Sequence, residues 1–318
     1  MTLAIGLGLL ASHAAAPGGA MRSPTLFGLN VPTLGALDAS TAAIGARAAL
    51  VGTFADWAHA PDFPHETAAR INARGAVPVI SWEPWDSWRG GADQPRYALA
   101  HIAAGDHDAL IDRWAVQVAR YHRPVMLRFA AEMNGDWLPW STGVNGNGPG
   151  DYVAAWRHVR ARFARAGALN AIWVCNPIAH YDGATPLRAV FPGRRDVDWT
   201  AVDGYNWGAA RDRGWQDYDD VLAPTLRALR RLSPGSPRMI AETGSAPDPR
   251  KAAWVRDTLS RARAEEVAAV VWFEFEKETD WRLSESPAAA AAARDVVRSG
   301  SWLRGGDLAA VERAVKSR

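Results

Sequence analysis

The chain has 318 residues, of which 48% are hydrophobic and 22% charged, and 36 basic against 34 acidic residues leave a net charge of +2. This composition predicts a soluble protein with a large core, and the near balance of charge gives no electrostatic basis for binding nucleic acid or an anionic membrane surface. The single cysteine, Cys175, excludes an intrachain disulfide and a thiolate-rich metal site. The eight histidines are scattered without metal-ligand spacing, so we expect neither a metal nor a cofactor.

Residues 1–16 have the character of a short secretion signal. Leu3 to Leu10 are apolar, and three alanines precede Pro17 as small residues do at signal cleavage sites. No basic residue precedes the apolar run, so a cytosolic N-terminus is the alternative to secretion. The run is too short to cross a bilayer, and no other segment reaches that length. We expect a secreted protein without a membrane span, and by default a monomer.

From residue 25 onward, a short apolar run and a helix-like stretch alternate eight times. The apolar runs begin near Leu26, Ala49, Val77, Val125, Ala171, Thr200, Met239 and Ala268. Alternating strands and helices form right-handed parallel βαβ units, and eight such units close into a barrel. The pattern therefore predicts an α/β fold with a single (β/α)8 TIM barrel over residues 17–300. Residues 301–318 form an amphipathic tail that we expect on the outside or at one end of the barrel.

Acidic and aromatic side chains gather where the predicted strands end. Ten of the sixteen tryptophans lie at these ends or in the loops that follow them: Trp57, Trp82, Trp85, Trp88, Trp137, Trp140, Trp207, Trp215, Trp272 and Trp281. In barrels of this kind, functional side chains lie at the C-terminal ends of the strands. Sugar rings stack on tryptophan and present hydroxyls to polar side chains, so the pattern favours a carbohydrate substrate.

Glu132 and Glu242 end the fourth and seventh apolar runs, three strands apart around the ring. Their side chains should face each other across the barrel mouth, as the two carboxyl groups of a glycosidase flank the bond that is cut. A separation of about 5–5.5 Å would indicate a retaining mechanism. The competing interpretation is that each glutamate belongs to a structural ion pair, with Arg128 as the obvious partner.

The motif Arg128-Phe-Ala-Ala-Glu-Met-Asn-Gly-Asp-Trp137 resembles the acid/base motif of glycoside hydrolase family 26. The resemblance continues in order through Gly150-Asp151-Tyr152, Asp203-Gly-Tyr-Asn-Trp207, Ile240-Ala-Glu-Thr-Gly244, Trp272-Phe273 and Lys277-Glu-Thr-Asp-Trp-Arg282. Members of this family are retaining β-glycanases with a (β/α)8 barrel, and they include β-mannanases, mixed-linkage β-glucanases and β-1,3-xylanases.

The resemblance implies a role for each of these residues. Glu132 would be the general acid/base, Glu242 the nucleophile, and Tyr205 the donor of a hydrogen bond to the nucleophile. Trp137 and Trp272 would be sugar platforms, and Trp281 with Arg282 would contact a sugar on the non-reducing side. The remaining substrate-binding candidates are Trp82, Trp85, Arg128, Asn134 and Trp207.

Ala131 departs from the family pattern, because the residue before the acid/base is usually His. Loss of one such hydrogen-bonding group often costs on the order of a hundredfold in rate. Three explanations remain open: His101, Asn134 or Asn176 fills the gap, the substrate differs at the sugar normally touched, or activity is reduced.

Two functions are therefore in competition. The first is a retaining endo-β-glycanase that acts on a β-linked polysaccharide, with β-1,4-mannan or mixed-linkage β-glucan favoured. The second is a non-catalytic or weakly active glycan-binding barrel in exopolysaccharide metabolism. The presence of Glu132, Glu242 and Tyr205 together favours the enzyme.

Overall fold

The computed structural model describes residues 23–317, so the predicted signal segment 1–16 lies outside the described residues. Eight strands of this part of the chain form the barrel: β1 (Thr25–Asn30), β2 (Leu50–Asp56), β3 (Val77–Glu83), β4 (Val125–Phe129), β5 (Ala171–Cys175), β6 (Trp199–Asn206), β7 (Arg238–Ser245) and β8 (Ala269–Phe273). Each strand pairs in parallel with the next, and β1 pairs with both β8 and β2, which closes the ring. The predicted (β/α)8 TIM barrel is confirmed.

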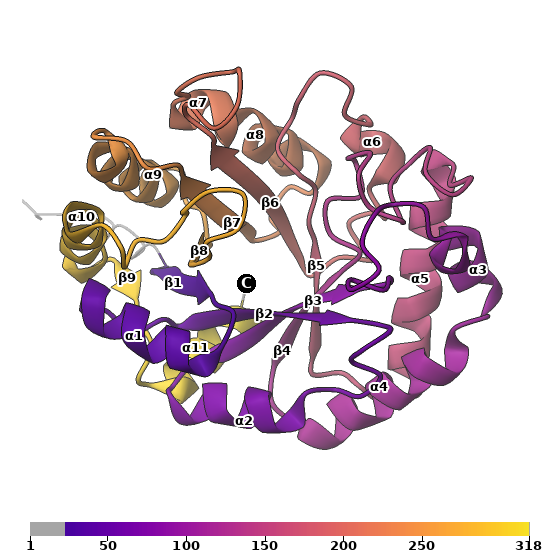
Figure 1. Ribbon diagram of the computed structural model, residues 1–318. Helices are drawn as coiled ribbons and strands as arrows, with labels where there is room; N and C mark the ends of the chain where they lie inside the picture. Colours follow the sequence, from indigo (N-terminus) through magenta and orange to yellow (C-terminus); the bar gives the residue numbers. More distant parts are fainter. Residues whose placement is uncertain (1–22, 318) are drawn as a thin grey trace, which may run out of the picture.

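Helices surround the barrel on its outer face (Figure 1). They are α1 (Leu34–Ile44), α2 (His65–Ala73), α3 (Leu99–Ala104), α4 (Asp108–Tyr121), α5 (Pro149–Arg165), α6 (Leu187–Val190), α7 (Tyr218–Val221), α8 (Ala223–Leu232), α9 (Lys251–Ala264) and α10 (Pro287–Arg298). A short 3-10 helix, η1 (Pro95–Tyr97), precedes α3. The Asp151 carboxylate accepts the Gly148 N–H at the start of α5 and so helps to cap this helix. None of the helices in residues 23–317 is long and apolar enough to cross a membrane.

The C-terminal segment closes the bottom of the barrel. Strand β9 (Trp302–Leu303) pairs with the start of β1, and helix α11 (Leu308–Lys316) follows it. Val311 and Val315 of this helix are buried in one cluster with the interior side chains at the N-terminal ends of the strands. Of the two places expected for the tail, it therefore takes the end of the barrel, opposite the ends that carry the polar residues.

Side chains alternate between the barrel interior and the helix layer along each strand. On β4, Met126 belongs to the interior cluster, whereas Leu127 and Phe129 pack among the helices. Arg128 therefore points inward, toward the C-terminal mouth. This alternation decides which residue at each strand end can reach the mouth.

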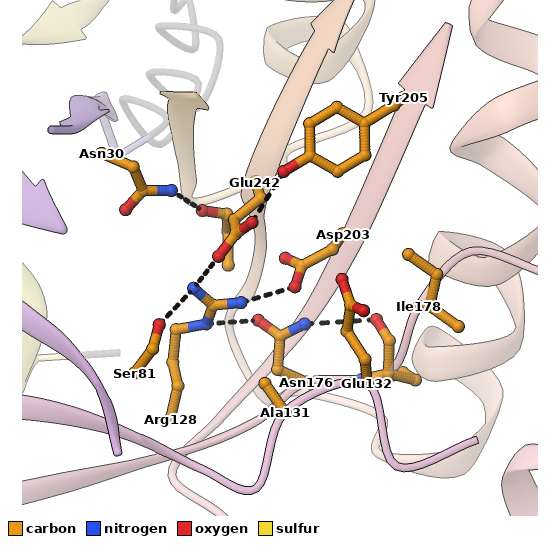
Figure 2. A network of polar contacts seen from close by, with 12 residues as sticks. Asn30, Ser81, Arg128, Ala131, Glu132, Asn176, Ile178, Asp203, Tyr205 and Glu242 are labelled. Atoms are coloured by element: carbon orange, nitrogen blue, oxygen red, sulfur yellow. Dashed lines mark hydrogen bonds and ion pairs between the residues drawn. The ribbon is translucent and has the colours of Figure 1, made fainter. Parts of the chain in front are cut away.

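Asn30 crosses from β1 to β7 inside the barrel. Its side-chain amide donates a 2.8 Å hydrogen bond to the carbonyl of Ala241, the residue before Glu242 (Figure 2). Gly52 lies beside Asn30 on β2, and a Cβ atom at this glycine would overlap the Asn30 Oδ1 atom. A residue without a side chain is therefore required at position 52.

We predict that Gly52→Ala displaces the Asn30 side chain and breaks its buried hydrogen bond to β7. Overpacking together with a lost buried hydrogen bond should lower the free energy of unfolding by about 2–4 kcal/mol. Chemical denaturation measures this loss. Gly150→Ala is the matched control, because a Cβ atom there meets nothing within 4 Å and alanine favours the helix. Equal stability of the two variants would contradict the packing argument.

Candidate active site

A cleft of about 1160 Å3 opens at the C-terminal ends of the strands. It exceeds the usual range of small-molecule pockets, roughly 300–1000 Å3, and therefore suits several linked rings better than one. Carboxylates and aromatic rings line it, drawn from the C-terminal ends of strands and from the loops after β3, β4, β5, β6 and β8.

A buried cation, Arg128, lies at the floor of the cleft. Its side chain is only 1% exposed, and its guanidinium forms ion pairs with Asp203 and Glu242 (Figure 2). It also donates 2.8 Å hydrogen bonds to Ser81 Oγ and Asn176 Oδ1. Arg128 was predicted to bind substrate, but its donors are directed to protein groups instead. The expectation of an Arg128 ion pair is confirmed for Glu242.

Glu242 is held from two sides on β7. One carboxylate oxygen faces Arg128, and the other accepts a 2.7 Å hydrogen bond from the Tyr205 hydroxyl. Burial raises the pKa of Tyr205 well above its usual range, so the hydroxyl stays a proton donor. Strand pairing shifts by a bulge between Val202 and Asp203, which aligns Asp203 with Glu242 at the mouth.

Glu132 lies in a turn three residues beyond the end of β4. Ala130 and Glu132 both have positive φ angles, 47° and 59°, a conformation that is uncommon for residues other than glycine. Hydrogen bonds hold the turn: the Glu132 N–H donates to the Asn176 carbonyl at 2.7 Å, and Trp140 Nε1 donates to the Ala131 carbonyl at 2.7 Å. The Glu132 carboxylate is thereby turned over the cleft, where Trp137 Nε1 donates to it at 3.0 Å.

Three carboxylates meet around Arg128. Glu132, Asp203 and Glu242 each place an oxygen within 4.8 Å of an oxygen of the other two. Such a cluster could bind a cation, but the Arg128 guanidinium already supplies positive charge there. Burial raises the pKa of Glu132 to about 7, and the nearby charge of Glu242 adds to the effect. The Glu132 carboxyl can therefore hold or release a proton near neutral pH.

A fourth carboxyl, Glu83 at the end of β3, also lines the cleft. Burial, reinforced by the charge of Glu242 and opposed by that of Arg128, raises its pKa to about 8. Trp85 Nε1 donates to one of its oxygens at 3.1 Å. At pH 7 this carboxyl is therefore mostly protonated and can donate a hydrogen bond.

Four of the predicted tryptophans do line the cleft, namely Trp85, Trp137, Trp207 and Trp281. Trp137 is the most accessible of them, with 41% of its surface exposed beside Glu132. Trp281 lies on the other side, edge-on to Trp207 with their ring centroids 4.8 Å apart. Trp137 therefore offers an accessible apolar face beside Glu132, whereas Trp281 is only 1% exposed.

Two predicted sugar contacts, Trp82 and Trp272, were wrong. Both side chains are fully buried between the barrel and the helices: Trp82 packs on Trp114, and Trp272 packs on Trp254. Inward and outward positions alternate along a strand, so the neighbours Glu83 and Phe273 reach the cleft in their place.

Asn134 and Arg282 also have structural partners rather than a place in the cleft lining. Asn134 is buried and exchanges two hydrogen bonds with the backbone of Ile178, which ties the loops after β4 and β5 together. Arg282 forms an ion pair with Asp280 and another with Glu276. Their role as substrate-binding residues stays a prediction.

None of the three residues considered to replace the missing His beside Glu132 lines the cleft. His101 is paired with Asp106, and Asn134 is occupied as described. Asn176 is fully buried, where it accepts from Arg128 and donates to the Pro177 carbonyl. Ala131 itself lines the cleft, so the space beside Glu132 stays open.

Sequence reasoning missed several residues of the cleft: Phe54, Glu83, Tyr181, Asp203, Phe273, Phe275 and Lys277. The alternation of side chains along a strand could have identified two of them, because Glu83 and Phe273 each follow a tryptophan that faces outward. Asp203 opens the same motif as Tyr205 and could have been chosen on that ground. The others lie in loops or on strand ends where the sequence shows no distinguishing pattern.

We predict that the stability of the protein relative to its Glu83→Gln variant falls as pH rises from 5 to 8. The unfolded carboxyl titrates near 4.5 and the folded one near 8, so the folded state holds a proton that the unfolded chain has released. Rising pH removes the stability that this bound proton gives the folded state. Glutamine does not titrate, so the Glu83→Gln variant loses no stability in this way. Thermal unfolding at several pH values measures the difference. Glu66→Gln, on an exposed turn of α2, is the control, and its stability difference from wild type should not change with pH in this way. If the stability difference between wild type and Glu83→Gln were equally independent of pH, the prediction would be contradicted.

The sequence matches the model of Glycosyl hydrolase family 26 over residues 32–249. Endoglucanase H from Acetivibrio thermocellus is 35% identical over 265 residues, which cover 81% of this chain and 28% of that protein. Beta-1,3-xylanase TXYA from Vibrio sp is 27% identical over 183 residues, which cover 55% of this chain and 36% of that protein. The chain thus spans roughly a third of the length of the curated relatives it matches.

Solved structures agree at the level of the fold. A GH26 beta-mannanase from Bacteroides ovatus superposes with a TM-score of 0.68 and 16% identity, covering 92% of this chain and 93% of that one. A modular endo-beta-1,4-mannanase from Cellulomonas fimi gives a TM-score of 0.67 and 17% identity, covering 91% and 74%. The family match, together with the identity to endoglucanase H, shows that the chain belongs to glycosyl hydrolase family 26.

Proposed function

We propose that this protein is a retaining endo-β-glycanase in which Glu132 is the acid/base and Glu242 the nucleophile. One observation carries the proposal: the two carboxyl groups lie close together in opposite environments. Burial raises the pKa of Glu132 to about 7, whereas the Glu242 carboxylate is held in place by hydrogen bonds from Arg128 and Tyr205. A pair of this kind supplies one acid and one base at the same pH.

In the first step, the Glu242 carboxylate attacks the anomeric carbon of the sugar in the cleft. The bond to the glycosidic oxygen breaks, and Glu132 transfers its proton to that oxygen, so the leaving chain departs neutral. Arg128 and Tyr205 orient Glu242 for the attack. The oxygens of Glu132 and Glu242 lie within 4.8 Å of each other, close spacing of the kind that favours direct attack over a bridging water.

In the second step, Glu132 acts as a base. It takes a proton from water, and the water oxygen attacks the anomeric carbon as the bond to Glu242 breaks. The sugar leaves with its original configuration, and Glu132 is protonated again. A carboxyl with a pKa of about 7 serves both steps because its two protonation states have similar populations at neutral pH.

We propose β-1,4-mannan or mixed-linkage β-glucan as the substrate. Relatives of the chain are named endoglucanase and β-1,3-xylanase, and the superposed structures are β-mannanases, so this family and fold include several β-glycanases. The volume of the cleft and the aromatic rings that several loops place along it support cleavage within a chain rather than at its end. Because such polymers lie outside cells, we further propose that the protein is secreted, and that it acts as a monomer.

We predict that Glu242→Ala lowers kcat by at least about 10⁴-fold, because the covalent intermediate cannot form. Reducing-sugar release on the substrate that the wild type cuts measures this loss. Binding to the same polymer should persist. Glu66→Ala, on the exposed face of α2, is the control and should retain full activity. Equal hydrolysis by Glu242→Ala and wild type would remove the nucleophile assignment.

Glu132→Ala should also lose most activity, but azide should restore turnover and yield a glycosyl azide of retained configuration. Azide fits the space left by the carboxylate and needs no base to attack the intermediate. Product analysis by mass spectrometry and NMR checks this result. Absence of the azide product would count against the acid/base role of Glu132.

Glucomannan, galactomannan, barley β-glucan and β-1,3-xylan form the substrate screen. Release from one of them identifies the polymer class. If none of the four polymers is hydrolysed but any of them is still bound, the result would favour the second function, a glycan-binding barrel that does not hydrolyse. The open space at Ala131 is the observation that keeps this alternative in place.

A further inference from the structure

Trp88 is the most exposed of the tryptophans, with 82% of its surface accessible, and it belongs neither to the core nor to the cleft lining. It lies in the loop that follows β3. One face of its ring stacks on His59 with the ring centroids 3.8 Å apart and the planes 20° from parallel. The stacked pair leaves the second face of the Trp88 ring free.

Hydrogen bonds fix this pair in place. The Asp56 carboxylate accepts from both the backbone N–H and the ring Nδ1 of His59, at 2.8 and 2.9 Å. The Asp86 carboxylate accepts from the Trp88 N–H at 3.1 Å. Gln94 is buried beneath the loop and donates to the carbonyls of Asp86, Gly90 and Gly91. The loop is thus pre-organised, which reduces the entropy cost of binding a ligand on it.

Polar groups connect the stacked pair of Trp88 and His59 to the cleft. Asp56 and Ser87 line the cleft, and the Ser87 hydroxyl donates to Asp56 at 2.6 Å. The same Asp56 carboxylate that lines the cleft therefore orients His59 under Trp88. An exposed aromatic face beside carboxylate and hydroxyl groups matches the two surfaces of a sugar ring, which is apolar on its faces and polar at its edge.

We propose that the stacked pair of Trp88 and His59 is a distal subsite for the glycan, at the end of the cleft bounded by the loops after β2 and β3. This inference rests on the proposed function, because the ligand is a continuation of the same polysaccharide chain. A sugar beyond those at the carboxylates stacks on the free face of Trp88. Asp56 and Ser87 contact the chain on its way to Glu132 and Glu242.

The test compares Trp88→Ala with wild type on a long polymer and on a trisaccharide of the same linkage. Loss of one stacking contact, about 1–2 kcal/mol, should lower the polymer-to-trisaccharide ratio of kcat/KM roughly 5- to 30-fold. The change should appear mainly in KM for the polymer, and Trp88→Phe should recover part of it. Leu169→Ala is the control, because Leu169 is exposed in the loop before β5, at the opposite end of the barrel. An unchanged ratio in Trp88→Ala would overturn the subsite.

Affinity electrophoresis in gels that contain each of the four screened polymers separates this proposal from the proposed function, since retardation needs no hydrolysis. If wild type is retarded and Trp88→Ala is not, the subsite stands even for a barrel that cuts nothing. If wild type hydrolyses a polymer and both proteins are retarded equally, the subsite fails while the glycanase stands. Thermal unfolding of Trp88→Ala should match wild type, because the ring is exposed; a large drop would assign Trp88 a structural role and also overturn the subsite.

Discussion

The ion pairs of Arg128 are the interaction on which the rest of the site depends. A fully buried guanidinium is costly unless carboxylates compensate it, and buried carboxylates at the same place repel one another unless a cation lies between them. Arg128 meets both requirements by contacting Asp203 on β6 and Glu242 on β7 from its own position on β4. It therefore connects opposite sides of the barrel mouth. Ser81 and Asn176 take further donors and fix the guanidinium plane.

The positive charge of Arg128 cannot neutralise four carboxylates, so some of the carboxyl groups around it must be protonated. Glu83, Glu132, Asp203 and Glu242 share this mouth, and burial raises the pKa of the first three. Glu242 is the carboxylate with two donors on separate oxygens, from Arg128 and Tyr205. The proposed difference in role between Glu132 and Glu242 depends on Arg128, which forms its ion pair with Glu242.

The barrel could be predicted because its signals are local and repeated. Each of the eight apolar runs begins within one residue of a strand in the structure, and Glu132, Glu242, Tyr205 and Trp137 lie together as expected.

The errors have a common physical cause. Trp82 and Trp272 sit one position from inward-facing residues, and a shift of one residue exchanges the two faces of a strand. Tryptophan was taken as a sign of sugar binding, whereas in this barrel it also fills the layer between strands and helices. The partners of Asn134 and Arg282, Ile178 and Asp280, could not be predicted because they depend on loop conformations that residue spacing does not reveal.

The tryptophans therefore divide into two physical classes that composition alone cannot separate. A tryptophan between the barrel and the helices contributes apolar burial and packs against other rings, as Trp82 does with Trp57 and Trp114. A tryptophan on a loop keeps a face free only where polar groups hold the loop without covering the ring. Trp137 meets this condition through its hydrogen bond to Glu132, and Trp88 through Asp86 and Gln94. The useful indicator for the aromatic residues proposed to bind sugar is thus the hydrogen bonding beneath the loop, because buried polar anchors make an exposed apolar face rigid.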